Sequence, residues 1–205
     1  FVHIHDGNSN LQDNEIRSIY QSASWIIWVG TYNGVSFGTR SYFKLIDVDS
    51  GLTNDSVNAF TQTRDGRIWV ATADGLNTYR PEATDAFYKN RSLKFPTNLS
   101  SNAVMSLYGE QAILWAGTLD SGLNKVNLET GHTTVFRERV TEENSISGNG
   151  ITSILRTSNG QLLIGTYGGG LNIFHESSEE FEHLKFDINN PKSIGSNNVV
   201  ALLED

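Results

Sequence analysis

A short sequence pattern recurs four times along this chain. In each copy, three apolar residues are followed by Gly or by Ala and then by threonine, and the threonines lie 41, 46 and 48 residues apart. A repeat of about 40 to 50 residues is typical of propellers and solenoids, in which each unit buries its apolar surface by stacking on its neighbours. The four copies occupy residues 27–31, 68–72, 114–118 and 162–166.

Further columns of similar residues keep nearly the same spacing around this pattern. An apolar residue lies upstream, at positions 11, 52, 99, 146 and 194, and a second apolar residue follows it after five positions. A glycine follows each threonine after three or four positions. Several independent columns would not keep nearly the same spacing by chance, so the chain is built from repeated units. Between the apolar columns lies a polar column, Asn14, Asp55, Asn102, Asn149 and Asn197, and the glycines are Gly34, Gly75, Gly122 and Gly170.

Each unit translates into four short antiparallel strands. The second strand is the pattern that ends in threonine, and Asp65-Gly66 or Asn159-Gly160 before it predicts a tight turn, because such pairs tolerate positive φ. The spacing of Gly and Asn leaves no room for the amphipathic helices of a helical repeat. Four strands in about 47 residues match one propeller blade. The sequence therefore predicts an all-β fold, a β-propeller of about four four-stranded blades, whose fourth strands carry Phe43, Phe87, Phe136 and Phe181.

The repeat columns also set the expected boundaries of the blades. We place the four repeats at approximately 11–50, 51–96, 97–144 and 145–192. Residues 1–10 are expected to give a lone fourth strand of a preceding blade, and residues 193–205 only the first strand of a following one. The chain is therefore expected to be a segment of a larger propeller, or an open arc that closes by pairing with a second copy.

Two columns of the second strand predict how blades pack on each other. A tryptophan there buries on the order of 200 Å² and is expected to fill the space between neighbouring sheets. A small residue two positions later lets a neighbouring backbone or side chain approach closely. The tryptophans are Trp28, Trp69 and Trp115, and the small residues are Gly30, Ala71, Gly117 and Gly165.

Composition excludes several functions. The chain has 205 residues and a formal net charge of −8, with 15 Lys and Arg against 23 Asp and Glu, which argues against nucleic-acid binding. It has no cysteine, which excludes disulfides, thiolate catalysis and Cys-ligated metals. No apolar run approaches the about 20 residues of a membrane-spanning helix, and no secretory signal peptide is recognisable.

These motifs resemble the two-component regulator propeller repeat. The similarity is clearest over residues 145–174, which include the run from Ile164 to Asn172, and over residues 65–79. The first repeat departs from the pattern, because residues 22–25 replace the Asp-Gly or Asn-Gly turn. The resemblance implies a propeller of seven blades in the extracytoplasmic, periplasmic sensor region of a membrane-bound histidine kinase or diguanylate cyclase. It implies a ligand-binding segment without catalysis or cofactor, tethered to the membrane through its parent protein, with a homodimer as one arrangement.

Ligands of propellers usually bind at the face that carries the turns between second and third strands and the loops between blades. That face is expected to include the loops 139–149 and 187–198. Amides, hydroxyls and tyrosines in such a place suit an oligosaccharide, a peptide or another small molecule. The polar column recurs in every repeat, so we interpret it as structural, with each Asn bonded to its own backbone two residues on. The predicted ligand-binding residues are Tyr32, Asn33, Asp74, Asp120, Tyr167 and Gly168.

Metal and enzyme hypotheses have weaker support in the sequence. His3 and His5 lie on one face of a strand, but no further ligands complete a site. Residues 63–69 resemble a sialidase Asp box only superficially, because Asp65 and Gly66 are adjacent. The alternatives to a sensor are therefore a scaffold for protein interactions and, with less support, a carbohydrate-active propeller enzyme. The glutamate pairs 142–143 and 179–180 are interpreted as solvated surface.

Overall fold

The computed structural model describes residues 5, 7, 11, 13–23, 25–39, 42–79, 88–89 and 98–205. Within these residues all regular structure is β-strand, and no helix is long and apolar enough to cross a membrane. The first two sheets contain β1 (Ile16–Gln21), β2 (Ile27–Thr31), β3 (Gly34–Thr39), β4 (Tyr42–Ile46), β5 (Val57–Gln62), β6 (Ile68–Thr72), β7 (Gly75–Tyr79) and β8 (Tyr88–Lys89). The other two contain β9 (Val104–Glu110), β10 (Ile113–Thr118), β11 (Leu123–Asn127), β12 (Thr133–Phe136), β13 (Ile151–Arg156), β14 (Leu162–Thr166), β15 (Gly170–His175) and β16 (Glu180–Leu184).

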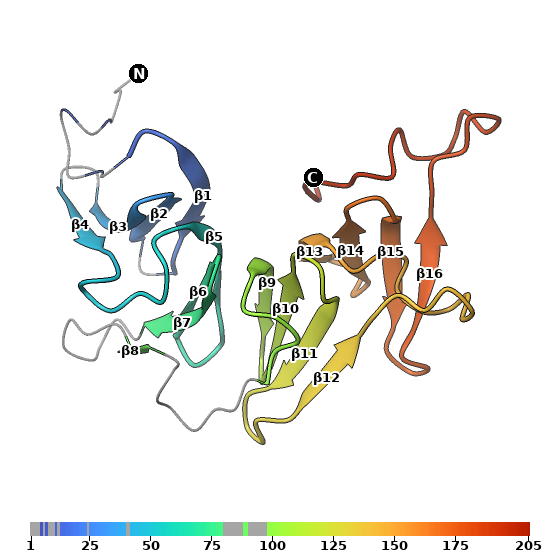
Figure 1. Cartoon of the computed structure of the whole chain (residues 1–205), viewed down its shortest axis with the longest axis horizontal. Helices are drawn as coiled ribbons and strands as arrows, with labels where there is room; N and C mark the ends of the chain where they lie inside the picture. Colours follow the sequence, from blue (N-terminus) through green and yellow to red (C-terminus); the bar gives the residue numbers. More distant parts are fainter. Residues whose placement is uncertain are drawn as a thin grey trace. The chain divides into compact units, whose positions relative to one another are not determined.

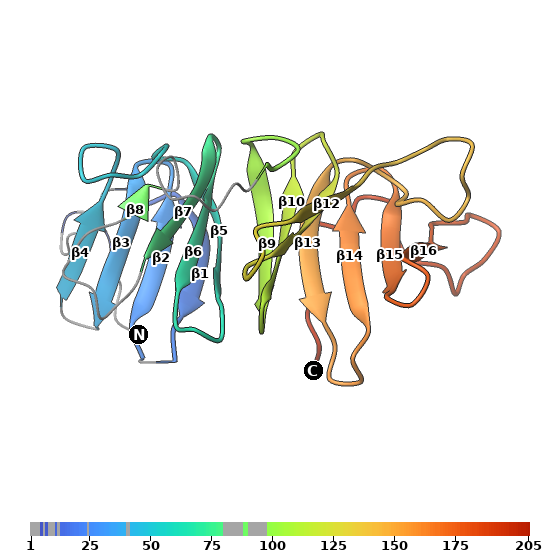
Figure 2. The ribbon, with the colours of Figure 1, turned by 90° about the horizontal axis from the view of Figure 1, so that it is seen from below.

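Each sheet is an antiparallel meander whose four strands pair in chain order (Figure 1). Figure 2 shows the strands of each sheet running alternately up and down. The predicted all-β fold of four four-stranded sheets is therefore confirmed. The fourth-strand residue Phe87 lies outside the described residues, as does most of the strand expected in 1–10.

The chain divides into two compact units. The first contains β1 to β8 and the second contains β10 to β16, while residues 97–112, which include β9, are shared between the two. Each unit contains two neighbouring sheets.

The core of the first unit forms around Trp28, which is fully buried. Its ring stacks on Phe37 of its own sheet at 4.7 Å between centroids. From the next sheet, Tyr79 meets it edge-on at 5.2 Å and Phe60 lies 6.2 Å away. The predicted role of this tryptophan, filling the space between neighbouring sheets, is therefore confirmed.

The second unit repeats this arrangement around Trp115. The Phe174 ring, from the next sheet, meets the Trp115 ring edge-on at 5.2 Å, and Phe136 of the same sheet lies 6.3 Å away. Phe181 of β16 packs against both phenylalanines, at 5.0 and 5.4 Å. Lys125 covers the cluster, with Nζ 5.5 Å from the Trp115 ring centroid.

The turn between the first and second strands of the first repeat has the same backbone conformation as the Asp-Gly turn of the second repeat, although Trp25 stands where this conformation favours glycine. Trp25 has φ of 64°, in the region where Gly66 of the next repeat has 80°. In both turns the N–H at this position donates to the carbonyl three residues earlier, at 2.9 Å. A bulky residue is disfavoured at positive φ, so this turn stores strain that the glycine turns avoid.

The small-residue column allows three elements to approach one point. At Gly165 an added Cβ would meet Ser153 Oγ from the first strand of the same sheet. It would also lie 2.8 Å from Val199 Cγ1 in the C-terminal segment. The second repeat replaces both members of this pair at once, because Ala71 faces Ala59 across the strands. The chain therefore compensates for the methyl group by removing the serine hydroxyl.

We expect Gly165→Ala to lower the free energy of unfolding by about 1–3 kcal/mol, the usual cost of overpacking. The double substitution Gly165→Ala with Ser153→Ala is expected to recover at least half of this loss. Ser153→Ala alone serves as the control, because the buried Ser153 hydroxyl has no hydrogen-bond partner among the described residues. Urea denaturation of the three variants gives the coupling energy, and strictly additive losses would contradict the compensation.

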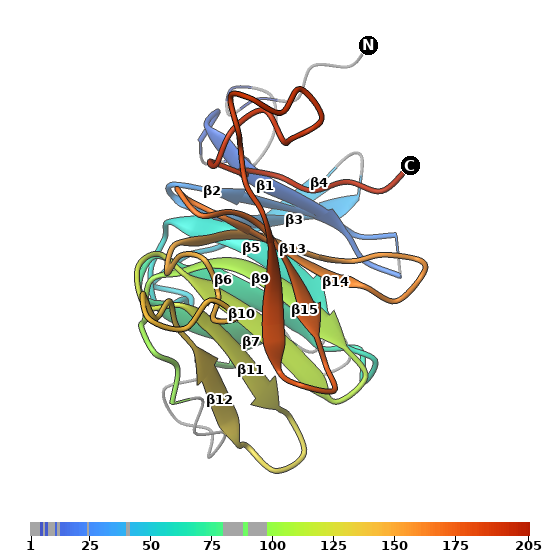
Figure 3. The ribbon, with the colours of Figure 1, turned by 90° about the vertical axis from the view of Figure 1, so that its right-hand side faces the viewer.

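The segment after β16 forms no strand, although the sequence predicts the first strand of a further blade there. Figure 3 follows it, in red, out through a loop and back to the C-terminus. One of its contacts nevertheless repeats a contact that the residues just before β5 make with the first sheet. Gly170 N–H donates to Asn197 O at 2.9 Å, as Gly34 N–H donates to Asp55 O at 2.8 Å. Glu204 Oε2 accepts from Ser158 N–H at 2.7 Å. A strand needs a partner, and no described residue supplies one here.

Candidate functional site

All six predicted ligand-binding residues lie in the turns between second and third strands. The threonine that ends each second strand builds the turn, because its hydroxyl donates to the carbonyl of the turn glycine. The same hydroxyl accepts a turn N–H in three of the four copies. The turns thus keep a fixed shape while the residues at their tips vary. Tyr32 and Asn33 follow β2, Asp74 follows β6, Asp120 follows β10, and Tyr167 and Gly168 follow β14.

In the first unit, two of the three predicted residues are engaged in local polar contacts. Asn33 Nδ2 donates to Asp13 Oδ2 at 3.2 Å, and Asp74 Oδ1 accepts from Asn102 Nδ2 at 3.1 Å. Tyr32 is half exposed, and the Arg17 guanidinium lies 4.4 Å above its ring. Tyr32 is therefore the residue of this group that offers a surface to a ligand.

In the second unit, the structure brings two of the turns side by side. Tyr167 N–H donates to Gly150 O at 2.9 Å. An added Cβ at Gly150 would lie 2.9 Å from Leu119 O and 3.4 Å from Tyr167 Cβ, so only glycine fits between the turns. Tyr167 is 71% exposed and Leu119 is 57% exposed. We name Leu119, Asp120, Gly150, Tyr167 and Gly168 the turn site.

The turn site combines three kinds of surface that a ligand can use. The Tyr167 ring is a flat apolar face, and Asp120, in the neighbouring turn, is exposed and carries a carboxylate. Gly168, with φ of 89°, presents bare backbone, since nothing lies within 4 Å of the place of its missing Cβ. An aromatic face beside polar acceptors and open backbone suits a polar organic ligand such as a sugar or a peptide.

The polar column is structural, but its hydrogen bonds differ from those that the sequence predicts. At three of the five positions the side chain bonds to a distant segment rather than to its own backbone two residues on. Asn149 Oδ1 accepts from Glu138 N–H at 2.9 Å, and Asp55 Oδ1 accepts from Val48 N–H at 2.9 Å. Asn197 Oδ1 makes the same bond with Phe186 N–H. Each of these three side chains thus caps the segment that follows the fourth strand of the preceding sheet.

We expect Asn149→Ala to lower the free energy of unfolding by about 1–2 kcal/mol, because Glu138 N–H loses its acceptor. Asn149→Asp is the matched control, since only the oxygen is used and the second repeat already carries Asp55 there. It is expected to cost less than about 0.5 kcal/mol. Thermal and urea denaturation measure both variants, and an equal loss in the two would contradict the capping role.

Three buried asparagines of the third strands were not singled out from the sequence. Asn124 Oδ1 accepts from Ser100 N–H at 2.8 Å, while its Nδ2 donates to Ser100 Oγ and to Ala116 O. Asn77 and Asn172 bind the chain before their own sheets in the same way. A polar residue repeated directly after the buried leucine, in Leu76-Asn77, Leu123-Asn124 and Leu171-Asn172, was the available signal.

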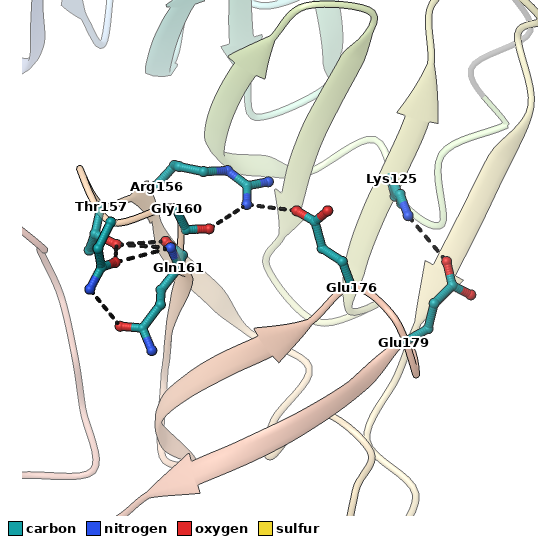
Figure 4. A network of polar contacts seen from close by, with 8 residues as sticks. Lys125, Arg156, Thr157, Gly160, Gln161, Glu176 and Glu179 are labelled. Carbon is teal, nitrogen blue, oxygen red and sulfur yellow. Dashed lines mark hydrogen bonds and ion pairs between the residues drawn. The ribbon is translucent and has the colours of Figure 1, made fainter.

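The turns between first and second strands are closed on themselves. In the segment that resembles an Asp box, Asp65 Oδ1 accepts from Thr63 Oγ1 at 2.7 Å and from Arg67 N–H at 3.2 Å. Thr157, Asn159 and Gln161 form the equivalent turn of the fourth repeat (Figure 4). The oxygens of these side chains close the turn, so the motif has a structural role here.

Three exposed glutamates form ion pairs, and two of them, Glu142 and Glu179, belong to the pairs expected at the solvated surface. Glu179 Oε1 lies 3.1 Å from Lys125 Nζ, and Glu176 Oε1 lies 2.6 Å from Arg156 Nη1 (Figure 4). Glu142 pairs with Arg139 at 2.9 Å. Glu142 and Glu179 remain more than half exposed, so they lie on the solvated surface as expected and form their ion pairs there.

A long loop between the third and fourth sheets crosses the outer edge of β16. We name residues 138–147 the strap. Asn144 O accepts from Phe181 N–H at 2.9 Å, and His183 Nε2 lies at a hydrogen-bond distance of 2.6 Å from Ser145 O. The strap and β16 enclose a pocket of about 790 Å³, which contains none of the turn-site residues. No sequence pattern predicts this contact, which joins residues about 40 positions apart.

No group of three or more His, Asp or Glu residues that could hold a metal ion occurs in the described part of the chain. His5 is described, but its predicted neighbour His3 lies outside the described residues. The His183 ring is hydrogen-bonded to the Ser145 carbonyl of the strap.

The comparisons agree with this architecture. The family model described as two component regulator propeller matches residues 51–74 and 145–168. No curated protein matches the chain. The extracellular domain of the candidate one-component system BT4673 from B. thetaiotaomicron is 22% identical, with a TM-score of 0.76 over 97% of this chain and 25% of that chain. That of the candidate hybrid two-component system BT3049, from the same organism, is 24% identical, with a TM-score of 0.63 over 76% and 21%.

One of the solved structures with this fold is an enzyme. A virginiamycin B lyase from Staphylococcus aureus is 16% identical, with a TM-score of 0.61 over 88% of this chain and 59% of that chain. At these identities the likeness shows the fold alone, a β-propeller. The chain spans about a quarter of the length of the two extracellular domains.

Proposed function

Because this chain carries two-component regulator propeller repeats, we propose that it is a ligand-binding sensor segment of a membrane-bound signalling protein. The output domain, a histidine kinase or a diguanylate cyclase, belongs to the parent protein. The segment itself is non-catalytic and binds an oligosaccharide, a peptide or another small polar ligand. It lies outside the cytoplasm, as do the extracellular domains that share its fold.

The observation that carries this proposal is the turn site. Elsewhere in the chain the repeated polar residues are used to build the fold: the asparagines and aspartates cap neighbouring segments, and the threonines close the turns. Tyr167 and Asp120 are exposed at the tips of two turns that Gly150 holds together. Exposed aromatic and acidic groups on a rigid scaffold are typical of binding sites rather than of packing.

A thermal-shift screen of the chain against oligosaccharides and peptides tests ligand binding. A true ligand raises the melting temperature, because it binds the folded state alone, and the stabilisation grows with the logarithm of ligand concentration over Kd. Tyr167→Ala and Asp120→Asn are expected to abolish the shift without changing the melting temperature of the free chain. Trp25→Ala is the matched control, because it removes an exposed aromatic ring outside the turn site.

Three results would redirect the proposal. A shift that survives both turn-site substitutions would move the ligand elsewhere on the chain. Turnover of a glycan by the parent ectodomain would favour a carbohydrate-active enzyme, and stable capture of a folded protein without any small-molecule shift would favour a scaffold. Size-exclusion chromatography with light scattering measures whether two copies associate.

A further inference from the structure

Beside the strap, β16 presents backbone groups to the outside of its sheet. In an antiparallel pair, successive residues point their N–H and C=O groups alternately toward the partner strand and away from it. Phe181 N–H points away from β15, because it donates to Asn144 O in the strap. His183 has the same parity, so its backbone groups also point outward. Among the described residues, no backbone carbonyl outside the sheet accepts from His183 N–H.

The pocket next to this edge is strongly acidic. Its walls come from the strap, from β16 and from the end of β15, and their only arginine and lysine are Arg139 and Lys185. Arg139 is neutralised by Glu142, with Nη1 2.9 Å from each carboxylate oxygen. The glutamates that line the pocket are Glu138, Glu142, Glu143, Glu180 and Glu182.

We propose that the strap pocket and the outer edge of β16 bind an extended, lysine- or arginine-rich peptide segment. The peptide backbone pairs with the outward N–H and C=O of His183, which continues the sheet by one strand. Alternate side chains of an extended peptide point to the same side, and their charges pair with Glu143 and with Glu182, whose present neighbour His175 has Nε2 3.5 Å away. An acidic peptide is repelled, and a small organic cation meets the carboxylates without using the strand edge.

This site is separate from the turn site, so its test does not depend on the proposed function. The probe is a fluorescent peptide of alternating lysine and threonine, titrated into the full chain and followed by anisotropy. We expect saturable binding that weakens as salt is added, and no binding of the matching glutamate–threonine peptide. The lysine peptide with alternate backbone nitrogens methylated keeps its charge and loses its donors. It is expected to bind roughly tenfold more weakly.

Variants locate the site on the chain. Glu143→Gln with Glu182→Gln is expected to weaken binding of the lysine peptide roughly tenfold, since two charge-assisted contacts become neutral. Glu129→Gln, an exposed glutamate outside the pocket, is the control and is expected to change nothing. Equal affinity for the methylated peptide would show attraction by charge alone and overturn the proposal. So would unchanged affinity in the double variant, or absence of saturation by about 1 mM peptide.

Discussion

Trp115→Ala is expected to lower the free energy of unfolding by about 3–5 kcal/mol, the usual cost of removing a large aromatic side chain from a core. Trp115 is 1% exposed and packs between two sheets against Phe136 and Phe174. The substitution leaves a cavity that neither sheet can close, because the phenylalanines are held by contacts with Phe181. Urea denaturation followed by circular dichroism measures the loss.

Trp25→Ala is the matched control for this prediction. Trp25 is 78% exposed, so its replacement is expected to change stability by less than about 0.5 kcal/mol. Hydrogen exchange adds a spatial test, because protection should fall in the two sheets that share Trp115. A loss below about 1 kcal/mol for Trp115→Ala would contradict the assignment of this ring to the core.

Asn124→Ala is expected to cost about 2–4 kcal/mol, because the buried amide bonds to three groups and its removal takes a hydrogen-bond partner from each of them. These groups are the N–H and the hydroxyl of Ser100 and the carbonyl of Ala116. The effect should also loosen the chain before β9, since the side chain ties Ser100 to the third strand. Chemical denaturation and hydrogen exchange around Ser100 measure the two effects.

The first repeat supplies the control for Asn124. Ser36 takes the place of the asparagine there, and its buried hydroxyl has no hydrogen-bond partner among the described residues. Ser36→Ala is therefore expected to be neutral or slightly stabilising, because an unsatisfied buried hydroxyl is removed. A large loss in Ser36→Ala, or a negligible one in Asn124→Ala, would show that the amide network does not carry the stability assigned to it.

The fold was predictable because it repeats. Columns such as the tryptophans reveal strand positions without any long-range information, and the structure places Trp28 and Trp115 between sheets as expected. The bonds of Asn149 were not predictable in the same way. An asparagine offers the same acceptor to its own turn and to a segment brought near by folding, and only the register of two sheets decides between them. The sequence shows that Ala71 and Ala59 stand where the other repeats have Gly and Ser. That the two changes compensate for each other follows only from the structure, in which these residues face each other across two strands.

The candidate site was predictable only in part. Placement of its residues in the turns follows from the repeat, and each of the six lies in such a turn. Leu119 and Tyr167 lie close together because the residue between them, Gly150, has no side chain. Only the folded structure shows that a Cβ at this position would meet both turns. The strap pocket depends on Asn144 and Ser145 meeting β16, a contact that no local pattern encodes.

The capping by Asn149 and Asn197 has a consequence for how such a chain can be lengthened or shortened. The opening residues of the next repeat add no strand to the preceding sheet, but Asn149 and Asn197 each form two hydrogen bonds with it. The side chain binds the segment after the fourth strand, and the backbone carbonyl binds the glycine of the turn between second and third strands. A cut between repeats would therefore leave the preceding sheet uncapped. The natural joint lies one strand later, in the turn between first and second strands, as in Asp65-Gly66 and Asn159-Gly160. Insertions, deletions and exchanges of repeats spliced at these turns should keep every cap within the same fragment as the second, third and fourth strands of the sheet that it closes.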